Sequence, residues 1–191
     1  PVNIAVIDKI EADDTIAYLS QKLKDDVIIY SADQDFLQLV NERITVYSPI
    51  KKKFYRPNDV FEQYGMHPYN FITMKCLMGD KSDNLPGVKG LGPKKLMKYF
   101  PEIGGKEKFT LQEAYQKATD KVDEHGIYGN VHLFKSQLEI NYELMCLEEI
   151  ELIESDQKEL DELIETKPYN FNKSKFLGMY EKDLLGRGIP N

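Results

Sequence analysis

The chain has 191 residues, of which 41% are hydrophobic and 30% are charged, and its formal net charge is −7. These values are those of a soluble globular protein, and no apolar run approaches the length of a membrane span, which excludes an integral membrane protein. The two cysteines, Cys76 and Cys146, are too few for a disulfide framework, and their use suits a reducing cytoplasm.

The negative charge is concentrated in one region. Residues 143–165 contain ten acidic side chains and one lysine, a net charge of −9, so the remainder of the chain carries +2. Discounting the seven carboxylates that we assign below to metal leaves that remainder at about +9. A basic body with an acidic appendage is compatible with a protein that binds nucleic acid.

The first predicted elements are a strand and a helix. Val2–Ile7 is a short, mostly apolar, β-branched run, which is typical of a strand buried on both faces. Ile10–Leu23 has apolar residues at helical spacing, and its first turn carries Glu11, Asp13 and Asp14. Acidic residues also favour a helix N-terminus through the helix dipole, but three in four positions exceed what that effect requires.

A second pair of carboxylates follows the next strand. Val27–Tyr30 is predicted to be a buried strand, and Asp33 and Asp35 lie at its carboxyl end, before an apolar helix over residues 36–40. In open parallel sheets, ligands sit outside the carboxyl ends of the strands. The alternative, a turn followed by a helix N-cap, explains Asp35 but not Asp33.

The middle of the chain combines a basic hairpin with helices. Ile44–Tyr47 is a third short strand, and residues 49–57 form a hairpin with lysines, an arginine and interleaved aromatic residues. Contact with a nucleic-acid backbone and a solvated β-ribbon explain this hairpin equally well. Asn58 is expected to cap a helix that runs to Tyr64, and another helix is expected over Pro68–Met78.

The segment 79–98 places two more carboxylates, Asp80 and Asp83, beside a glycine-rich turn. The order of the glycines and the preceding helix exclude a dinucleotide-binding fingerprint, and Pro93 stands where the lysine of a P-loop must be. What remains is a helix, a glycine turn and a second helix that starts at Pro93 and carries lysines. A simple interhelical turn explains the glycines but not the lysine cluster.

Beyond Phe100 the sequence is less informative. Residues 107–124 and 127–147 are predicted to be amphipathic helices with a packing role, and residues 148–165 a solvated acidic helix with its preceding loop. Residues 168–191 are predicted to form a final helix and a tail.

Seven carboxylates thus become candidate metal ligands, with no histidine or cysteine beside them: Glu11, Asp13, Asp14, Asp33, Asp35, Asp80 and Asp83. An all-oxygen ligand set selects hard cations, so the expected cofactors are two Mg²⁺ or Mn²⁺ ions. So many negative groups converge only if metal offsets their repulsion. Two ions about 3.5–4 Å apart are the standard arrangement for in-line attack on a phosphodiester.

Three stretches resemble a known family: Glu-Ala-Asp-Asp at 11–14, Ser-Ala-Asp-Gln-Asp at 31–35 and Gly-Asp-Lys-Ser-Asp-Asn-Leu-Pro-Gly-Val-Lys-Gly-Leu-Gly-Pro-Lys at 79–94. The family is the 5′ nuclease (flap endonuclease) family, which includes the 5′ nuclease domains of bacterial DNA polymerase I and the phage enzymes often called ribonuclease H. The resemblance implies an α/β fold with a parallel-sheet, PIN-like nuclease core followed by a helical lobe. It also implies a structure-specific 5′-3′ exonuclease or flap endonuclease that acts by a two-metal mechanism in replication or repair.

The same resemblance implies roles for residues. Glu11, Asp13, Asp14 and Asp33 would serve the first metal site, and Asp35, Asp80 and Asp83 the second, with Glu11, Asp14 and Asp33 as the catalytic set. The glycine turn would belong to a helix–three-turn–helix motif over about residues 69–100 that grips duplex DNA, and its main-chain carbonyls could hold K⁺. The residues expected to contact DNA are Gly87, Val88, Lys89, Gly90, Leu91, Gly92, Lys94, Lys95 and Lys98.

The resemblance has a gap at its N-terminal side. The family carries two further metal-binding aspartates and a helical arch, and nothing in this chain corresponds to either. We therefore expect residues 1–56 to be the C-terminal part of a nuclease core, 57–147 the helical lobe and 148–191 an acidic extension and tail. Two functions stay open: a nuclease, alone or with a separate N-terminal fragment, and an inactive module that binds duplex DNA. A single-strand ribonuclease is a weaker third, because it would not need segment 79–98.

The expected partners follow from this reading. They are duplex DNA with a 5′ flap, a nick or an RNA primer, and no membrane. The acidic region 143–165 and the aromatic tail suggest contact with a single-strand-binding protein or a polymerase. The expected location is the cytoplasm of a bacterium or of a phage-infected host cell.

Overall fold

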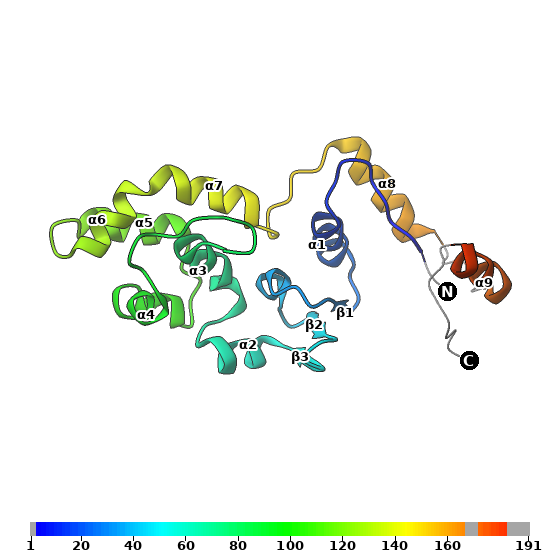
Figure 1. Ribbon diagram of the computed structural model, residues 1–191, viewed down its shortest axis with the longest axis horizontal. Helices are drawn as coiled ribbons and strands as arrows, with labels where there is room; N and C mark the ends of the chain where they lie inside the picture. The colour runs from blue at the N-terminus through cyan, green and yellow to red at the C-terminus, as the bar shows by residue number, and fades with distance from the viewer. Residues whose placement is uncertain (1–2, 167–171, 183–191) are drawn as a thin grey trace. The chain divides into compact units, whose positions relative to one another are not determined.

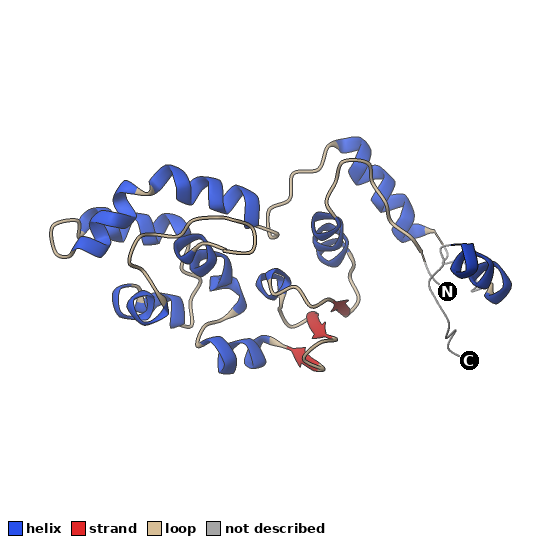
Figure 2. Ribbon diagram, in the orientation of Figure 1, coloured by secondary structure: helices blue, strands red, loops and turns tan. Residues whose placement is uncertain are grey.

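A computed structural model describes residues 3–166 and 172–182. The chain divides into two compact units, one formed by Glu11–Glu151 and the other by residues 1–10 together with residues 152–191 (Figure 1). The chain is mixed α/β, as predicted, with many helices and one small sheet (Figure 2). Within the described ranges, no helix combines the length and the apolar character that crossing a membrane requires.

The larger unit contains most of the regular structure. Its elements, in chain order, are α1 (Ala12–Lys22), β1 (Val27–Tyr30), the 3₁₀ helix η1 (Asp35–Leu39), β2 (Ile44–Ser48), β3 (Lys53–Tyr55), α2 (Pro57–Tyr64), η2 (Pro68–Asn70), α3 (Phe71–Met78), α4 (Pro93–Tyr99), η3 (Pro101–Gly104), α5 (Leu111–Asp120), α6 (Gly126–Leu133) and α7 (Lys135–Met145). The smaller unit contains α8 (Glu154–Glu165) and α9 (Lys173–Lys182).

The sheet has the order β1-β2-β3. β1 and β2 are parallel, with Val27 opposite Ile44, whereas β2 and β3 are antiparallel, with Val46 opposite Tyr55. The larger unit therefore contains a small mixed sheet with one parallel pair. The inner face of this sheet belongs to the same hydrophobic cluster as residues of α1 and η1, including Ala17 and Leu37.

The outer face of the sheet corrects the prediction that β1 is a buried strand. Ile28 is 62% exposed and Tyr30 is 71% exposed. Tyr30 and Tyr47 lie with ring centroids 5.3 Å apart, and Tyr47 and Phe54 lie 4.7 Å apart, so an aromatic row crosses all three strands. Only the inner face joins the described core, because α1 and η1 pack on that side.

The predicted strand Val2–Ile7 is wrong for its described part. Residues 3–7 form no strand, and Ile4 and Val6 are more than 70% exposed. The side chain of Asn3 donates hydrogen bonds to the carbonyl oxygens of Leu163 and Thr166, at 3.3 and 3.2 Å. A β-branched run becomes a strand only where another strand accepts its hydrogen bonds, and this segment lies along α8 instead.

Several predicted helices are confirmed with corrected boundaries. Helix α2 begins at Pro57, and Arg56 takes the cap position expected for Asn58, with its N–H donating to the Asp59 carboxylate at 2.9 Å. The predicted apolar helix over 36–40 is the 3₁₀ helix η1. The predicted helix over 127–147 is two helices, α6 and α7, which meet at Phe134.

The C-terminal expectations are confirmed where residues are described. The acidic helix is α8, and a last helix, α9, follows it. Residues 168–171 of the predicted C-terminal segment, and the predicted tail beyond Lys182, lie outside the described residues.

The loop after α3 is closed by a contact between two glycines. Gly79 ends α3 with φ +73°, and a Cβ placed on Gly87 would lie 1.9 Å from the carbonyl oxygen of Met78. Between the glycines, the N–H groups of Asp80 and Leu85 donate to each other's carbonyl oxygens at 2.9 and 2.7 Å. The side chain of Asn141 on α7 is fully buried and donates to the carbonyl oxygen of Pro86 at 2.9 Å. These contacts fix the loop against the helices.

Gly87→Ala is expected to destabilise the protein by about 3 kcal/mol or more, because the methyl group would overlap backbone atoms that cannot move away like a side chain. Gly126→Ala is the matched control, since a Cβ there meets no atom within 4 Å, and it is expected to change stability by about 0.5 kcal/mol or less. The measurement is chemical denaturation of both variants. Equal stability of the two would contradict the close approach at Gly87.

Candidate metal centre

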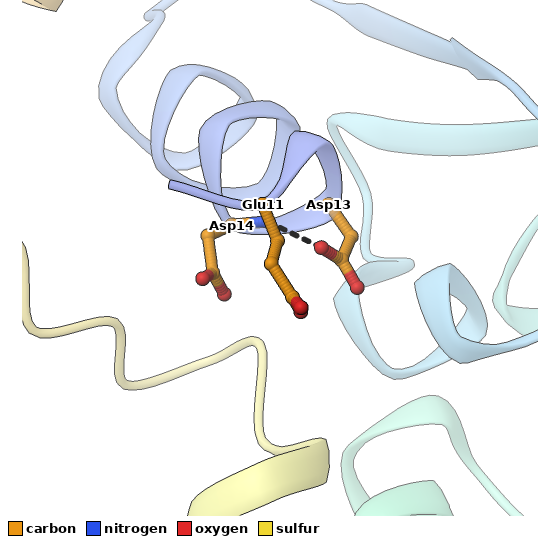
Figure 3. A group of neighbouring side chains, drawn as sticks. All are labelled: Glu11, Asp13 and Asp14. Atoms are coloured by element: carbon orange, nitrogen blue, oxygen red, sulfur yellow. Dashed lines mark hydrogen bonds between the residues drawn. The ribbon is translucent and has the colours of Figure 1, made fainter. Parts of the chain in front are cut away.

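The first group of carboxylates surrounds the start of α1. Glu11 is the N-cap residue, and Asp13 and Asp14 lie in the first helical turn. One carboxylate oxygen from each lies within 4.8 Å of the others, and the three side chains leave the helix on the same side (Figure 3). The Asp14 N–H donates to the Asp13 carboxylate at 3.1 Å. The helix start therefore presents three negative groups together, as the sequence predicted.

The electrostatics of this first group are repulsive. Burial raises the pKa of Asp14 above its ordinary value, and the neighbouring charges of Asp13 and Glu11 raise it further. None of the ion pairs found among the described residues involves these three carboxylates. A bound cation would relieve the repulsion.

The second group is assembled from two distant parts of the sequence. Asp35 begins η1, directly beyond the carboxyl end of β1, while Asp80 and Asp83 come from the glycine-closed loop after α3. Their oxygens also lie within 4.8 Å of one another. The Asp80 carboxylate accepts a hydrogen bond from the Ser82 N–H at 2.7 Å and another from its hydroxyl.

A lysine that the sequence analysis did not single out lies in this second group. The Lys75 ammonium of α3 contacts the carboxylates of Asp35 and Asp80, the latter at 2.7 Å, and its side chain is 9% exposed. Burial alone would lower the pKa of Lys75, but hydrogen bonds to both carboxylates outweigh this effect and raise it. One sequence feature could have identified Lys75, because it is the only charged residue in the helix 71–78.

The two aspartates of the second group that contact Lys75, Asp35 and Asp80, have pKa values shifted in opposite directions. Burial raises the pKa of Asp35, against the opposing effect of the nearby ammonium. Hydrogen bonds from Lys75 and Ser82 hold the pKa of Asp80 well below its ordinary value. Asp80 is therefore a carboxylate across the physiological pH range, ready to accept a cation.

Asp33 belongs to neither group. Its side chain is exposed and accepts a hydrogen bond from the Asp35 N–H at 2.8 Å, while its own N–H donates to the Ser31 hydroxyl at 3.1 Å. Asp33 thus forms a local turn next to Asp35. Its assignment to a metal site stays a prediction.

Gln38 is a second residue that the sequence analysis missed. Its buried amide donates to the carbonyl oxygens of Asp35 and Met145, both at 3.0 Å, and accepts from the Leu147 N–H at 2.8 Å. Gln38 thereby fixes η1, which carries Asp35, to the end of α7. An isolated glutamine in an apolar segment gives no sequence signal for this role.

The glycine turn, residues 87–92, contains buried apolar residues and is followed by exposed lysines. Val88 and Leu91 are buried, and the Val88 N–H donates to the Leu77 carbonyl at 2.9 Å. The carbonyl of Lys89 accepts a hydrogen bond from the Asn130 side chain at 2.9 Å, which fixes the turn from α6. The exposed residues of the predicted DNA-contacting set include Lys89, Gly90, Lys94, Lys95 and Lys98.

The donor atoms of both groups fit a divalent metal ion. Both groups offer only carboxylate oxygens, which are the ligands that hard divalent cations prefer. The carboxylates of each group come from short backbone segments, namely the start of α1, the start of η1 and the loop after α3, which bring three oxygens together.

Comparison with known proteins places this arrangement in context. Residues 1–65 match the family model described as "5'-3' exonuclease, N-terminal resolvase-like domain". The chain is 33% identical over 182 residues to a 5'-3' exonuclease of Aquifex aeolicus, covering 92% of this chain and 57% of that protein. It is 34% identical over 137 residues to the thermostable DNA polymerase I of Thermus thermophilus, covering 70% of this chain and 16% of the polymerase. The chain therefore spans a little over half, or less, of these relatives.

The fold is also similar to that of solved structures. The flap endonuclease of bacteriophage T5, solved as a pseudo-enzyme-product complex with DNA and metal ions, aligns with a TM-score of 0.68 at 23% identity. The alignment covers 84% of this chain and 62% of the phage protein. This likeness confirms the predicted fold class.

Asp14→Asn is expected to raise the melting temperature of the metal-free protein at pH 7–8. A carboxyl whose pKa is raised by folding contributes stability at low pH that is lost as the pH rises through the folded-state pKa. The advantage of the variant should therefore disappear as the pH falls toward 3.8, the ordinary value for an aspartate. Thermal melts from pH 3.5 to 8 test this, with the exposed Asp25→Asn as control. A variant that melts below the parent at pH 8 would refute the repulsion.

Proposed function

We propose that this chain, whose residues 1–65 match a 5'-3' exonuclease family model, is a 5′ nuclease that depends on a divalent metal and hydrolyses phosphodiester bonds of DNA at or near a 5′ end. The observation that carries the proposal is the pair of carboxylate groups, Glu11/Asp13/Asp14 and Asp35/Asp80/Asp83, within one compact unit. The names of the relatives, a 5'-3' exonuclease and DNA polymerase I, support this reaction class. Flaps, nicks and RNA primers are the substrates that we propose within it.

The residues have distinct proposed tasks. Glu11, Asp13 and Asp14 would hold one ion and Asp35, Asp80 and Asp83 another, with Asp33 beside Asp35 at the edge of the second group. When bound, two such ions supply positive charge that activates water and stabilises the negative charge that develops on a phosphate. The protein contributes the fixed positions of the carboxylates, since α1, η1 and the closed loop present them without rearrangement.

The glycine turn and α4 are the proposed grip on duplex DNA. Lys89, Lys94, Lys95 and Lys98 are exposed, and the buried Val88 and Leu91 hold the turn that carries them. The proposed contacts of these lysines are with phosphates, which carry no base-sequence information, so the grip would follow backbone shape and not sequence. K⁺ binding by the carbonyls of the turn, and contact of the acidic region with a replication protein, remain part of the proposal.

An alternative is a duplex-binding module that does not cut by itself. The relatives extend well beyond the part that this chain matches, so segments of theirs outside the match could be required for cleavage. Both candidate functions predict binding to duplex DNA, and only the nuclease predicts cleavage of it.

The test of cleavage uses a labelled 5′-flap duplex with Mn²⁺ or Mg²⁺, with and without a separately supplied N-terminal nuclease fragment of a relative. We expect metal-dependent cleavage that falls by at least about a hundredfold in Asp80→Asn and in Asp33→Ala. Asp25→Asn, an exposed carboxylate outside both groups, should retain activity. Binding without cleavage under both conditions would favour the duplex-binding module. Absence of binding would overturn both readings.

The DNA grip has its own test. The double substitution Lys94→Ala/Lys95→Ala should weaken duplex binding to the same extent for unrelated sequences, because only phosphate contacts are lost. The dependence of log affinity on log salt should become shallower by about 1 for each contact removed. Fluorescence anisotropy at several salt concentrations measures both quantities, with the exposed Lys24→Ala as control. An unchanged salt slope would show that α4 does not touch the phosphates.

A further inference from the structure

Lys75 stands apart from every other charged residue that the structure describes. Among the described residues classed as buried, it is the only one with a charged side chain. A buried lysine is costly unless carboxylates surround it, because its ammonium loses hydration. Here the carboxylates are Asp35 and Asp80, both members of the second ligand group. The lysine therefore occupies the same negative field that would attract a metal ion.

The position of Lys75 also joins the two halves of this ligand group. Asp35 comes from η1 and Asp80 from the loop after α3, and the ammonium contacts both carboxylates. Three carboxylates without a counter-ion would repel one another at these separations. With the ammonium in place, the net charge of the group is reduced by one, so the group can stay assembled before any metal binds.

The first ligand group provides the contrast. Glu11, Asp13 and Asp14 lie just as close together, yet the described ion pairs give them no lysine or arginine. A divalent ion at that group meets the full charge of three carboxylates. An ion at the second group must instead share two of its ligands with an ammonium already there.

We propose that Lys75 is a tethered cation that holds the Asp35/Asp80/Asp83 group together without metal and weakens divalent-metal binding there. The two ligand groups then differ in affinity, the second being the weaker and the more readily exchanged. Lys75 acts here as a positioning residue, through the two aspartates that it contacts. The inference rests on the proposed function only in taking these carboxylates as metal ligands, and it makes no assumption about DNA cleavage.

The test measures metal binding and stability without DNA. The full chain carrying Glu11→Gln and Asp14→Asn provides a background in which the second group dominates divalent binding. In that background Lys75→Met is expected to bind Mn²⁺ at least about tenfold more tightly by calorimetry, since one unit of positive charge is removed beside the ligands. The same variant should melt roughly 3–10 °C lower without metal, because two carboxylates lose their partner. Lys75→Arg, which keeps the charge, should retain the weaker binding.

Lys117→Met is the matched control. It removes a lysine that pairs with Glu102 at 2.6 Å, outside both carboxylate groups, and should leave Mn²⁺ affinity unchanged. Mn²⁺ affinity that is equal or lower in Lys75→Met would overturn the proposal and leave Lys75 as a structural ion-pair residue. Lys75→Gln replaces Lys75→Met if the latter does not fold.

A second measurement needs no substitution at Lys75. In the same background, the ¹⁵N signal of the Lys75 ammonium is followed by NMR during a Mg²⁺ titration. Displacement of the ammonium from Asp35 and Asp80 should shift that signal in step with binding. A signal that stays unchanged while Mg²⁺ binds to these aspartates would overturn the proposal. Failure of the flap-cleavage assay would leave either result intact.

Discussion

Repulsion between like charges is the constraint on which the rest of this structure depends. Six carboxylates gather in two groups, each with oxygens within 4.8 Å of one another. Two unit charges about 4 Å apart repel by about 1 kcal/mol in water and by about 4 kcal/mol near a protein surface. The fold therefore has to hold these side chains by rigid backbone and by buried hydrogen bonds. In the unpaired group, burial raises the pKa of Asp14, and the charges of Asp13 and Glu11 raise it further.

Three local devices provide that rigidity. The first turn of α1 sets the spacing of Glu11, Asp13 and Asp14. The Asp33 carboxylate accepts a hydrogen bond from the Asp35 N–H and so fixes the backbone between β1 and η1. The crossing of Gly79 and Gly87 closes the loop that carries Asp80 and Asp83. Each device is local in sequence, but their assembly depends on one hydrophobic cluster that runs from Ala17 to Leu147.

Local patterns predicted local structure well and tertiary contacts poorly. Helical spacing located α1, and the β-branched run Val27–Tyr30 became β1 with its predicted bounds. The similar run at Val2–Ile7 formed no strand in its described part, because strand formation needs a partner that composition does not reveal. The acidic residues that converge were visible in sequence, since three motifs placed them at a helix start, a strand end and a glycine turn.

The residues that hold the site together were not visible. Lys75, Gln38 and Asn141 are single buried polar residues, and each forms a hydrogen bond with a residue at least 40 positions away in the chain. Their roles depend on which helices contact one another, and the hydrophobic periodicity of the sequence does not predict those contacts. The structural role of a buried amide or ammonium can be recognised only when its hydrogen-bond partners are known.

The bonds of Gln38 have a consequence for how the molecule opens. Because one amide joins the backbone of Asp35 to that of Met145 and Leu147, η1 cannot unravel without breaking the hydrogen bonds at the end of α7. Regions linked in this way open as one cooperative unit, or foldon, with a common free energy. The carboxylate-bearing edge and a helix more than 100 positions away in the chain would then share one free energy of opening for their slowest-exchanging amides, so the site inherits the stability of that helix.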